Sequence, residues 1–178
     1  MKDSKFSQRG EHKAFIAMII ALILLAFVFL FFAREMAFQK LEENTPTRQN
    51  ILALRLSDEM FVDVLFANTK IVAEVAKSKE KKAKGLSNIQ NLEDGKGMLF
   101  VFEELGFQPF WNKETYIPLD ILWIKDDAVV HMLEGLPVYD GSNTMREYPP
   151  QKANYVLEVK HGFVKENSIK LGDKVLIK

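Results

Sequence analysis

The pattern of hydrophobic and polar positions divides the chain into one long apolar run followed by many short ones. The long run covers residues 14–33, twenty uncharged and mostly apolar side chains. At about 1.5 Å of rise per helical residue, a run of this length matches a bilayer core of roughly 30 Å. It carries none of the buried charges that mark a transport path, so the pattern predicts a single lipid-facing transmembrane helix.

A cleaved signal peptide is the alternative interpretation of this run. Signal peptides have an apolar core of about 7–15 residues and small residues at the cleavage site. Here the core is longer, and bulky Leu30, Phe31 and Phe32 precede Ala33 and Arg34. The sequence therefore favours an uncleaved, single-pass signal anchor.

Basic residues near the span give a weak indication of its orientation. Four precede it and three follow it closely: Lys2, Lys5, Arg9 and Lys13, then Arg34, Lys40 and Arg48. Cytoplasmic flanks carry an excess of Lys and Arg, and this small excess favours a cytoplasmic N-terminus. We therefore expect a short tail at residues 1–13 and a main domain on the extracytoplasmic side of the cytoplasmic membrane.

Beyond the span, the pattern changes to short apolar runs separated by turn residues. We interpret residues 34–50 as a stalk and residues 51–178 as one domain, because Pro46 cannot continue a helix from the span. Seven runs have the length and composition of strands: 61–66, 70–75, 97–102, 119–124, 129–133, 155–159 and 174–177. Many short strands and one or two short helices predict an all-β domain, a sandwich or a barrel.

Finer features of the domain follow from the same pattern. Residues 79–84 form a short predicted helix, with Ser78 as its N-cap and Gly85 as its C-cap. The run at 97–102 is apolar at every position, which predicts a central strand covered on both faces. We expect residues 107–116 to be extended and residues 135–152, rich in Gly and Pro, to form a long loop.

Charge and composition exclude several classes of function. After residue 34 there are 19 Lys and Arg against 22 Asp and Glu, a net charge of −3, which argues against nucleic acid as a partner. The chain has no cysteine, so disulfides, thiolate metal sites and cysteine nucleophiles are excluded. His131 and His161 lack metal-ligand spacing, and no phosphate-binding loop is present. We therefore predict neither a metal site nor a cofactor.

The densest group of special residues begins at Phe110. In an extended segment, Trp111, Lys113 and Thr115 project to one face. An aromatic plate, a cation and a hydroxyl in a row form a plausible small ligand surface. The alternative is structural: Trp111 fills part of the core, and the aliphatic part of Lys113 covers it.

Asp120 is the sharper exception to the apolar pattern, because it enters a strand whose neighbours are hydrophobic. A carboxylate in that position must be hydrogen-bonded or paired. It could orient a ligand or act as a general base, or it could accept backbone N–H groups at the start of the strand; the sequence favours the second role. Two of Glu114, Asp120 and Glu158 could also form a carboxylate pair for glycoside hydrolysis.

Lysines crowd around the short predicted helix, at positions 77, 79, 81, 82 and 84. Clustered lysines attract anionic lipid or an acidic polymer. A solvated helix face is the simpler explanation.

Several motifs, in their order and spacing, resemble those of a family of small bacterial and archaeal proteins known as domain of unknown function 192. The resemblance runs from about Val62 to the C-terminus. It rests on Lys84-Gly85-Leu86, residues 97–102, Phe110-Trp111, Lys113, Thr115, residues 117–122, Leu157-Glu158-Val159 and Gly172-Asp173. The usual run in that family is Phe-Trp-Met-Lys-Asn-Thr, so Asn112 and Glu114 depart from it, and a ligand contact made by the family's Asn would be altered here. The resemblance implies a compact, mostly β, jelly-roll-like fold and no established activity.

The leading hypothesis is a membrane-tethered, extracytoplasmic binding or accessory module. Its ligand surface would centre on Trp111, Lys113, Thr115 and Asp120, with Glu114 and Glu158 nearby. One alternative is a hydrolase of envelope polymer that uses Asp120 with Glu114 or Glu158, which requires two carboxylates facing one cleft. Another is a structural partner of a second membrane protein, which predicts an exposed apolar patch. The expected partners are thus the membrane, a cell-envelope polymer or another membrane protein.

Overall fold

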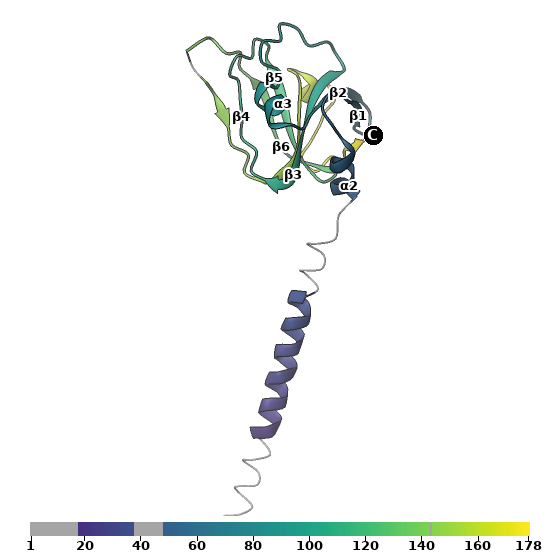
Figure 1. Ribbon diagram of the computed structural model, residues 1–178, viewed down its shortest axis with the longest axis vertical. Coiled ribbons are helices and arrows are strands. Elements are labelled where there is room, and N and C mark those ends of the chain that lie inside the picture. The colour runs from purple at the N-terminus through teal and green to yellow at the C-terminus, as the bar shows by residue number, and fades with distance from the viewer. Residues whose placement is uncertain (1–17, 38–47, 143) are drawn as a thin grey trace, which may run out of the picture. The chain divides into compact units, whose positions relative to one another are not determined.

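The computed structural model describes residues 18–37, 48–142 and 144–178 (Figure 1). The first of these ranges is a single helix, Met18–Ala37. Within these ranges it is the one helix long and apolar enough to cross a membrane, with a mean hydropathy of 2.4. The predicted tail, the first four residues of the predicted span and most of the predicted stalk lie outside the described residues. Residues 1–46 and 47–178 form two separate units.

The second unit consists mainly of short strands. Its helices are α2 (Arg48–Arg55), α3 (Lys79–Lys84) and α4 (Phe163–Glu166). Its strands are β1 (Phe61–Leu65), β2 (Lys70–Ala76), β3 (Lys96–Gly106), β4 (Phe110–Trp111), β5 (Leu119–Lys125), β6 (Ala128–Leu136), β7 (Arg146–Glu147), β8 (Ala153–Lys160) and β9 (Leu176–Ile177). The mostly β fold with few short helices is therefore confirmed.

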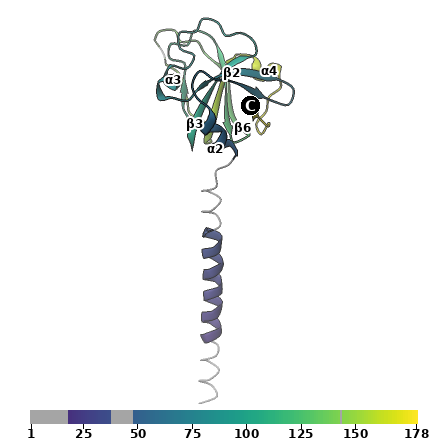
Figure 2. The ribbon, with the colours of Figure 1, turned by 45° about the vertical axis from the view of Figure 1, so that its right-hand side comes forward.

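Seven of the strands form one curled sheet in the order β6-β5-β8-β3-β2-β1-β9. All neighbouring pairs are antiparallel except β2 and β3, which are parallel and connected through α3. The remaining two, β4 and β7, pair with each other as a small separate ribbon. In Figure 2, α3 and α4 lie on opposite sides of the sheet.

The C-terminal segment connects the two edges of this sheet. Its first part pairs with β6, since the Gly172 and Val175 amides donate to Val129 and Asp127 carbonyls. Its second part, β9, pairs with β1 through Val64 and Leu65. Because the segment that ends in β9, one edge strand of the sheet, also bonds to β6 at the other edge, the sheet curls toward a closed barrel.

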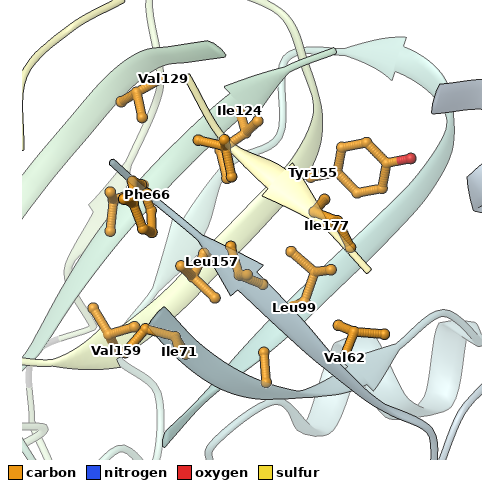
Figure 3. Packing of buried hydrophobic residues seen from close by; sticks show 14 of the residues in the cluster. Val62, Phe66, Ile71, Leu99, Ile124, Val129, Tyr155, Leu157, Val159 and Ile177 are labelled. Carbon is orange, nitrogen blue, oxygen red and sulfur yellow. The ribbon is translucent and has the colours of Figure 1, made fainter. Parts of the chain in front are cut away.

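The first hydrophobic core fills the concave side of the curled sheet (Figure 3). Alternate residues of the central strands point into it, such as Leu99 of β3 and Leu157 of β8, both fully buried. Phe66 and Phe163 pack edge to face with ring centroids 5.7 Å apart. Each buried side chain of this size contributes roughly 1.5–3 kcal/mol of hydrophobic stabilisation.

The second core covers the opposite face of β3, β5 and β8. It contains Phe100, Trp123 and Val156 from the sheet and Phe110 from β4. The expectation that residues 97–102 form a strand covered on both faces is thus confirmed. Since both faces of the sheet are apolar, any polar side chain on the second face lies in hydrophobic surroundings.

Of two local elements expected from the sequence, a helix at 79–84 and an extended segment at 107–116, the structure contains the first and only part of the second. The helix at 79–84 is confirmed, and the Lys81 amide donates to Ser78 Oγ at 3.0 Å, as a Ser N-cap should accept. The extended segment at 107–116 is only partly correct: β4 covers two residues, and Asn112–Thr115 turns, with the Thr115 amide donating to the Asn112 carbonyl at 3.0 Å. The loop at 135–152 likewise contains β7.

Candidate functional site

The segment that carries Trp111, Lys113 and Thr115 is fixed to the second core at two points. The Trp123 indole Nε1 donates to the Gln108 carbonyl at 2.7 Å, and the Phe110 ring packs edge to face on Phe100 at 4.7 Å. These contacts hold the segment over the convex face of the sheet. A site built on it therefore has a rigid floor.

Buried Asn112 shapes the turn that follows. Its Nδ2 donates to the Pro137 carbonyl at 3.0 Å, and its Oδ1 accepts from the Met145 amide at 2.8 Å. The amide thus joins the turn to the 137–147 loop, and its burial leaves Trp111 and Lys113 exposed. Asn112 has a structural role here, which strand alternation alone did not suggest.

Four of the six candidate residues line one pocket of about 230 Å³. These are Trp111, Lys113, Thr115 and Glu158. The aromatic rings of Phe100, Phe102 and Phe110 also line it, together with the C-terminal end of α3. Trp111, Lys113 and Thr115 thus line one pocket, but they do not share one face of an extended strand, because Asn112–Thr115 forms a turn.

Glu158 is the most unusual group in this pocket. It lies on the convex face of the sheet between Met98 and Ile121, its partners on β3 and β5, and is only 5% exposed. Its Oε2 atom is buried with no hydrogen-bond partner among the described residues. Burial raises the pKa of Glu158 to about 8, because a charged carboxylate is poorly solvated there.

Buried carboxyl groups without partners are rare in folded proteins, and they concentrate at functional sites. An uncharged carboxyl group offers one O–H donor and a carbonyl acceptor. Glu158 therefore presents an unused hydrogen-bonding group to the pocket.

Two aromatic rings at the pocket carry cations. Arg146 of β7 places its guanidinium carbon 4.4 Å from the Trp111 ring centroid, and Lys82 places Nζ 4.5 Å from the Phe102 centroid. Trp111 remains 39% exposed, so one part of its ring is available to a ligand. The prediction that Trp111 forms part of a contact surface stays a hypothesis, now with a defined cavity beside it.

The lysine cluster divides into lysines that make local contacts and lysines that do not. Lys77 donates to the Ala53 carbonyl, Lys81 forms an ion pair with Glu74, and Lys82 donates to the Val101 carbonyl at 3.1 Å. Burial lowers the pKa of Lys82. Lys84 is exposed and lines the pocket, so part of the cluster borders the candidate site.

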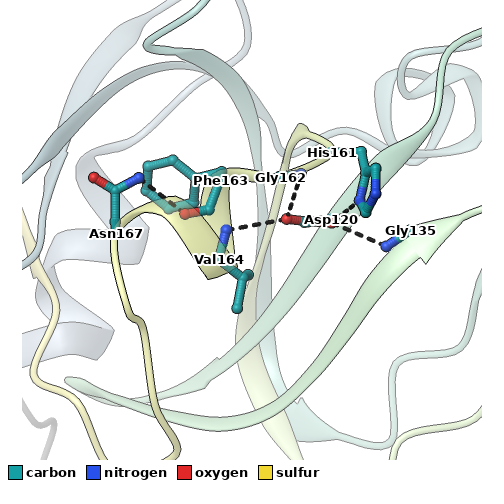
Figure 4. Close-up of polar contacts among 7 residues, drawn as sticks. All are labelled: Asp120, Gly135, His161, Gly162, Phe163, Val164 and Asn167. Atoms are coloured by element: carbon teal, nitrogen blue, oxygen red, sulfur yellow. Dashed lines mark hydrogen bonds and ion pairs between the residues drawn. The ribbon is translucent and has the colours of Figure 1, made fainter.

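Asp120 lies apart from this pocket, where the start of β5 and the end of β6 meet the start of α4 (Figure 4). Oδ1 accepts from the Gly135 amide at 2.9 Å and lies 2.7 Å from His161 Nδ1, while Oδ2 accepts from the Gly162 and Val164 amides at 3.0 Å each. The carboxylate is fully buried and has four partners. Of the two roles weighed from the sequence, this geometry matches the acceptor of backbone N–H groups.

The structure does not bring the proposed carboxylate pair together. Ile121 pairs with Glu158 across the strands, so Asp120 and Glu158 lie on opposite faces of the sheet. Glu114 is exposed in the turn and does not line the pocket. A hydrolase that uses Asp120 with Glu158 in one cleft is therefore not supported by this arrangement.

A second hollow, of about 320 Å³, lies near His161, whose side chain is 49% exposed. Two exposed ion pairs lie at its rim: Lys160 with Asp94 at 2.7 Å and Lys70 with Asp63 at 3.2 Å. Exposed pairs of this kind are common surface features. We therefore place the candidate site at the pocket that contains Glu158.

Glu114 has a backbone conformation that disfavours most side chains. Its φ is +56°, in the left-handed region, where Asn is several-fold enriched. The Asn of the resembled motif at this position is thus explained by backbone geometry without a ligand contact. We predict that Glu114→Asn raises the free energy of unfolding by about 0.5–1 kcal/mol.

Urea unfolding of the full chain in nanodiscs measures this change. The matched control is Glu93→Asn, at an exposed position without a positive φ, where no gain is expected. Equal effects of the two substitutions would contradict the backbone explanation.

The fold and the pocket together define a small curled-sheet domain with a lateral pocket, attached through its N-terminus to an apolar helix. The chain belongs to the domain of unknown function 192 family, DUF192, described as "Uncharacterized ACR, COG1430", whose model matches residues 62–177. The resemblance inferred from the motifs is confirmed. A comparison with curated proteins gives no match.

Two solved structures are similar to this chain. One, from Sinorhizobium meliloti 1021, is described as a proposed transcription regulator; it is 26% identical, has a TM-score of 0.58, and the match covers 66% of this chain and 92% of that one. The other, from Novosphingobium aromaticivorans DSM 12444, is described as a protein of unknown function. It is 30% identical with a TM-score of 0.57, and the match covers 66% of this chain and 84% of that one. The net negative charge of the present domain does not favour nucleic-acid binding.

Proposed function

We propose that this protein is a membrane-anchored binding module, and that its ligand occupies the pocket formed by Trp111, Lys113, Thr115 and Glu158. The observation that carries the proposal is the buried carboxyl group of Glu158 at a pocket with aromatic walls, whose Oε2 has no hydrogen-bond partner in the described part of the chain. Apolar walls with a few convergent polar groups are typical of small-molecule sites. A unit of a cell-envelope polymer is the ligand that fits a tethered domain best.

The location is part of the same proposal. The helix Met18–Ala37 serves as an uncleaved anchor, and the basic residues before it keep the N-terminus in the cytoplasm. The β domain then faces the extracytoplasmic side, where it meets envelope material.

Location is tested by cysteine labelling, because the natural chain has no cysteine. Gln151→Cys, at an exposed position of the domain, should react with a membrane-impermeant maleimide in intact spheroplasts. Ser7→Cys, before the helix, should react only after lysis. The reverse pattern would contradict the orientation, and a mature chain that lacks its first residues by mass spectrometry would contradict the anchor.

Binding is tested with the full chain in nanodiscs and with soluble fragments of the cell envelope. We expect the fragments to raise the melting temperature of the natural chain. Trp111→Ala should weaken their binding at least tenfold, because it removes an aromatic wall of the pocket. Phe107→Ala, another exposed aromatic residue that does not line the pocket, is the matched control. Equal losses in both variants would argue against this site.

A further inference from the structure

The charged residues that line the pocket are almost all basic. Lys82, Lys84 and Lys113 line it, and Arg146 stacks on the Trp111 ring at its wall. Glu158 is the one acidic residue of the lining. Three lysines and an arginine create a positive potential at the mouth, which attracts anions and opposes a cationic ligand.

Two of these lysines carry a charge that no described residue pairs. Lys82 is engaged with the Val101 carbonyl and the Phe102 ring. Lys84 and Lys113 are exposed, and within the described part of the chain their ammonium groups form neither an ion pair nor a hydrogen bond. Ammonium groups offer three donors each, and a carboxylate or phosphate accepts such donors in charge-assisted bonds.

Glu158, the acid at the pocket, complements these lysines because its uncharged carboxyl group can also donate a hydrogen bond to an anion. With its pKa raised to about 8, Glu158 is mostly uncharged at neutral pH, so it can donate a hydrogen bond. Anionic oxygens are acceptors only. An uncharged carboxyl group can therefore serve as a donor to an anion, whereas an ionised carboxylate at the same position would repel it.

We infer that the pocket binds the anionic carboxylate end of a small organic ligand, with Lys84 and Lys113 supplying charge and the uncharged Glu158 donating a hydrogen bond. This inference rests on the proposed binding function and specifies its ligand class. The Thr115 hydroxyl, which also lines the pocket, supplies a further polar contact. The body of the ligand packs on Phe100, Phe110 and Trp111.

The size of the pocket limits what it can hold. About 230 Å³ is below the roughly 300–1,000 Å³ typical of sites for drug-sized molecules. It fits a free small organic anion or one acidic unit at the end of a polymer. The chemistry recognised is the same in both cases.

Isothermal titration calorimetry of the full chain in phosphatidylcholine nanodiscs tests the inference. The probes are methyl glucuronide and benzoate, with uncharged methyl glucoside and benzyl alcohol as matched partners. We expect each anion to bind at least tenfold more tightly than its uncharged partner. Short oligogalacturonates that bind still more tightly than methyl glucuronide would identify a polymer unit as the source, and equal affinity would identify a free anion.

Proton linkage gives a second readout. Titrations at pH 8 in two buffers of different ionisation enthalpy should show proton uptake, because an anion selects the protonated form of Glu158. Above pH 8, affinity should fall about tenfold per pH unit as Glu158 ionises. Proton release on binding would mean that the bound state favours ionised Glu158, and it would overturn the inference.

Two variants identify the groups involved. Lys113→Gln should weaken anion binding at least fivefold, whereas Lys125→Gln, an exposed lysine outside the pocket, should not. Glutamine does not titrate in this range, so in Glu158→Gln the tenfold loss of affinity per pH unit above pH 8 should disappear.

The result that overturns the inference differs from the one that overturns the proposed function. Anions that bind no better than their uncharged partners, or not at all, exclude the anion class. If envelope fragments still bind in a manner that depends on Trp111, the binding function survives. If the fragments also fail to bind, both the anion inference and the proposed binding function are contradicted.

Discussion

Replacing Asp120 with asparagine is expected to destabilise the β domain by about 2–4 kcal/mol. The Asp120 carboxylate accepts from three backbone amides and contacts His161, all at a fully buried position. Asparagine places an NH₂ group where one carboxylate oxygen stood, so at least one buried N–H loses its acceptor. An unsatisfied buried group costs about 1–3 kcal/mol, and loss of the charged acceptor adds to this.

Urea unfolding of the full chain in nanodiscs measures the effect. Both tryptophans, Trp111 and Trp123, lie in the β domain, so their fluorescence reports on its unfolding alone. Asp94→Asn is the control, since it makes the same chemical change at a carboxylate that is 88% exposed and pairs with Lys160. A surface pair is worth about 0–1 kcal/mol. If Asp120→Asn were no more destabilising than Asp94→Asn, Asp120 would not have the structural role assigned to it.

The second large effect is expected for Glu158→Gln in alkaline solution. The pKa of Glu158 is about 8 in the folded domain and 4.5 in the unfolded chain, so the folded state holds a proton that the unfolded state releases. The stability that this proton gives the folded state is fully present below about pH 4.5, falls as pH rises, and is lost above about pH 8. Each unit of difference between the two pKa values corresponds to about 1.4 kcal/mol, so the full loss approaches 4–5 kcal/mol.

Glutamine has nearly the same shape and does not titrate. The Glu158→Gln variant should therefore match the natural chain near pH 4 and exceed its free energy of unfolding by about 4 kcal/mol at pH 9. Urea unfolding at several pH values checks this, with Glu104→Gln as the control at an exposed position of β3. If the difference between Glu158→Gln and the natural chain did not change with pH, Glu158 would be ionised in the folded state.

Much of the fold follows from the sequence because strand faces have a period of two. The run at 97–102 is apolar at every position, which predicted a central strand, and β3 lies between β2 and β8. The helix at 79–84 followed from its cap residues. The family resemblance, carried by motifs spread from Val62 to the C-terminus, was confirmed by the match to residues 62–177.

Other elements had no local signal. Strands β4 and β7 have two residues each, too few to show any periodicity, and Asn112 joins the loops beside them. Helix α2 begins at Arg48, inside the segment interpreted as a stalk. Pairing of the C-terminal segment with both β6 and β1 depends on the curl of the whole sheet.

The candidate site was predictable only where its residues are neighbours in the sequence. Trp111, Lys113 and Thr115 are close in sequence, so their shared position could be expected from local spacing. The contact of Asp120 with His161 joins residues 41 positions apart, and no local pattern indicates it. Glu158 was named only as a nearby carboxylate, since its position in the pocket depends on its register with Met98 and Ile121.

The most direct test of the account is the titration of the Glu158 carboxyl carbon by ¹³C NMR, in the full chain in nanodiscs. Glu158→Gln assigns the signal by its absence. We predict a pKa of about 8, which rises when methyl glucuronide or envelope fragments are added, because the bound anion stabilises the protonated form. A pKa near the ordinary 4.5, unchanged by any of these additions, would contradict the claim that Glu158 is the buried, uncharged acid of a binding pocket.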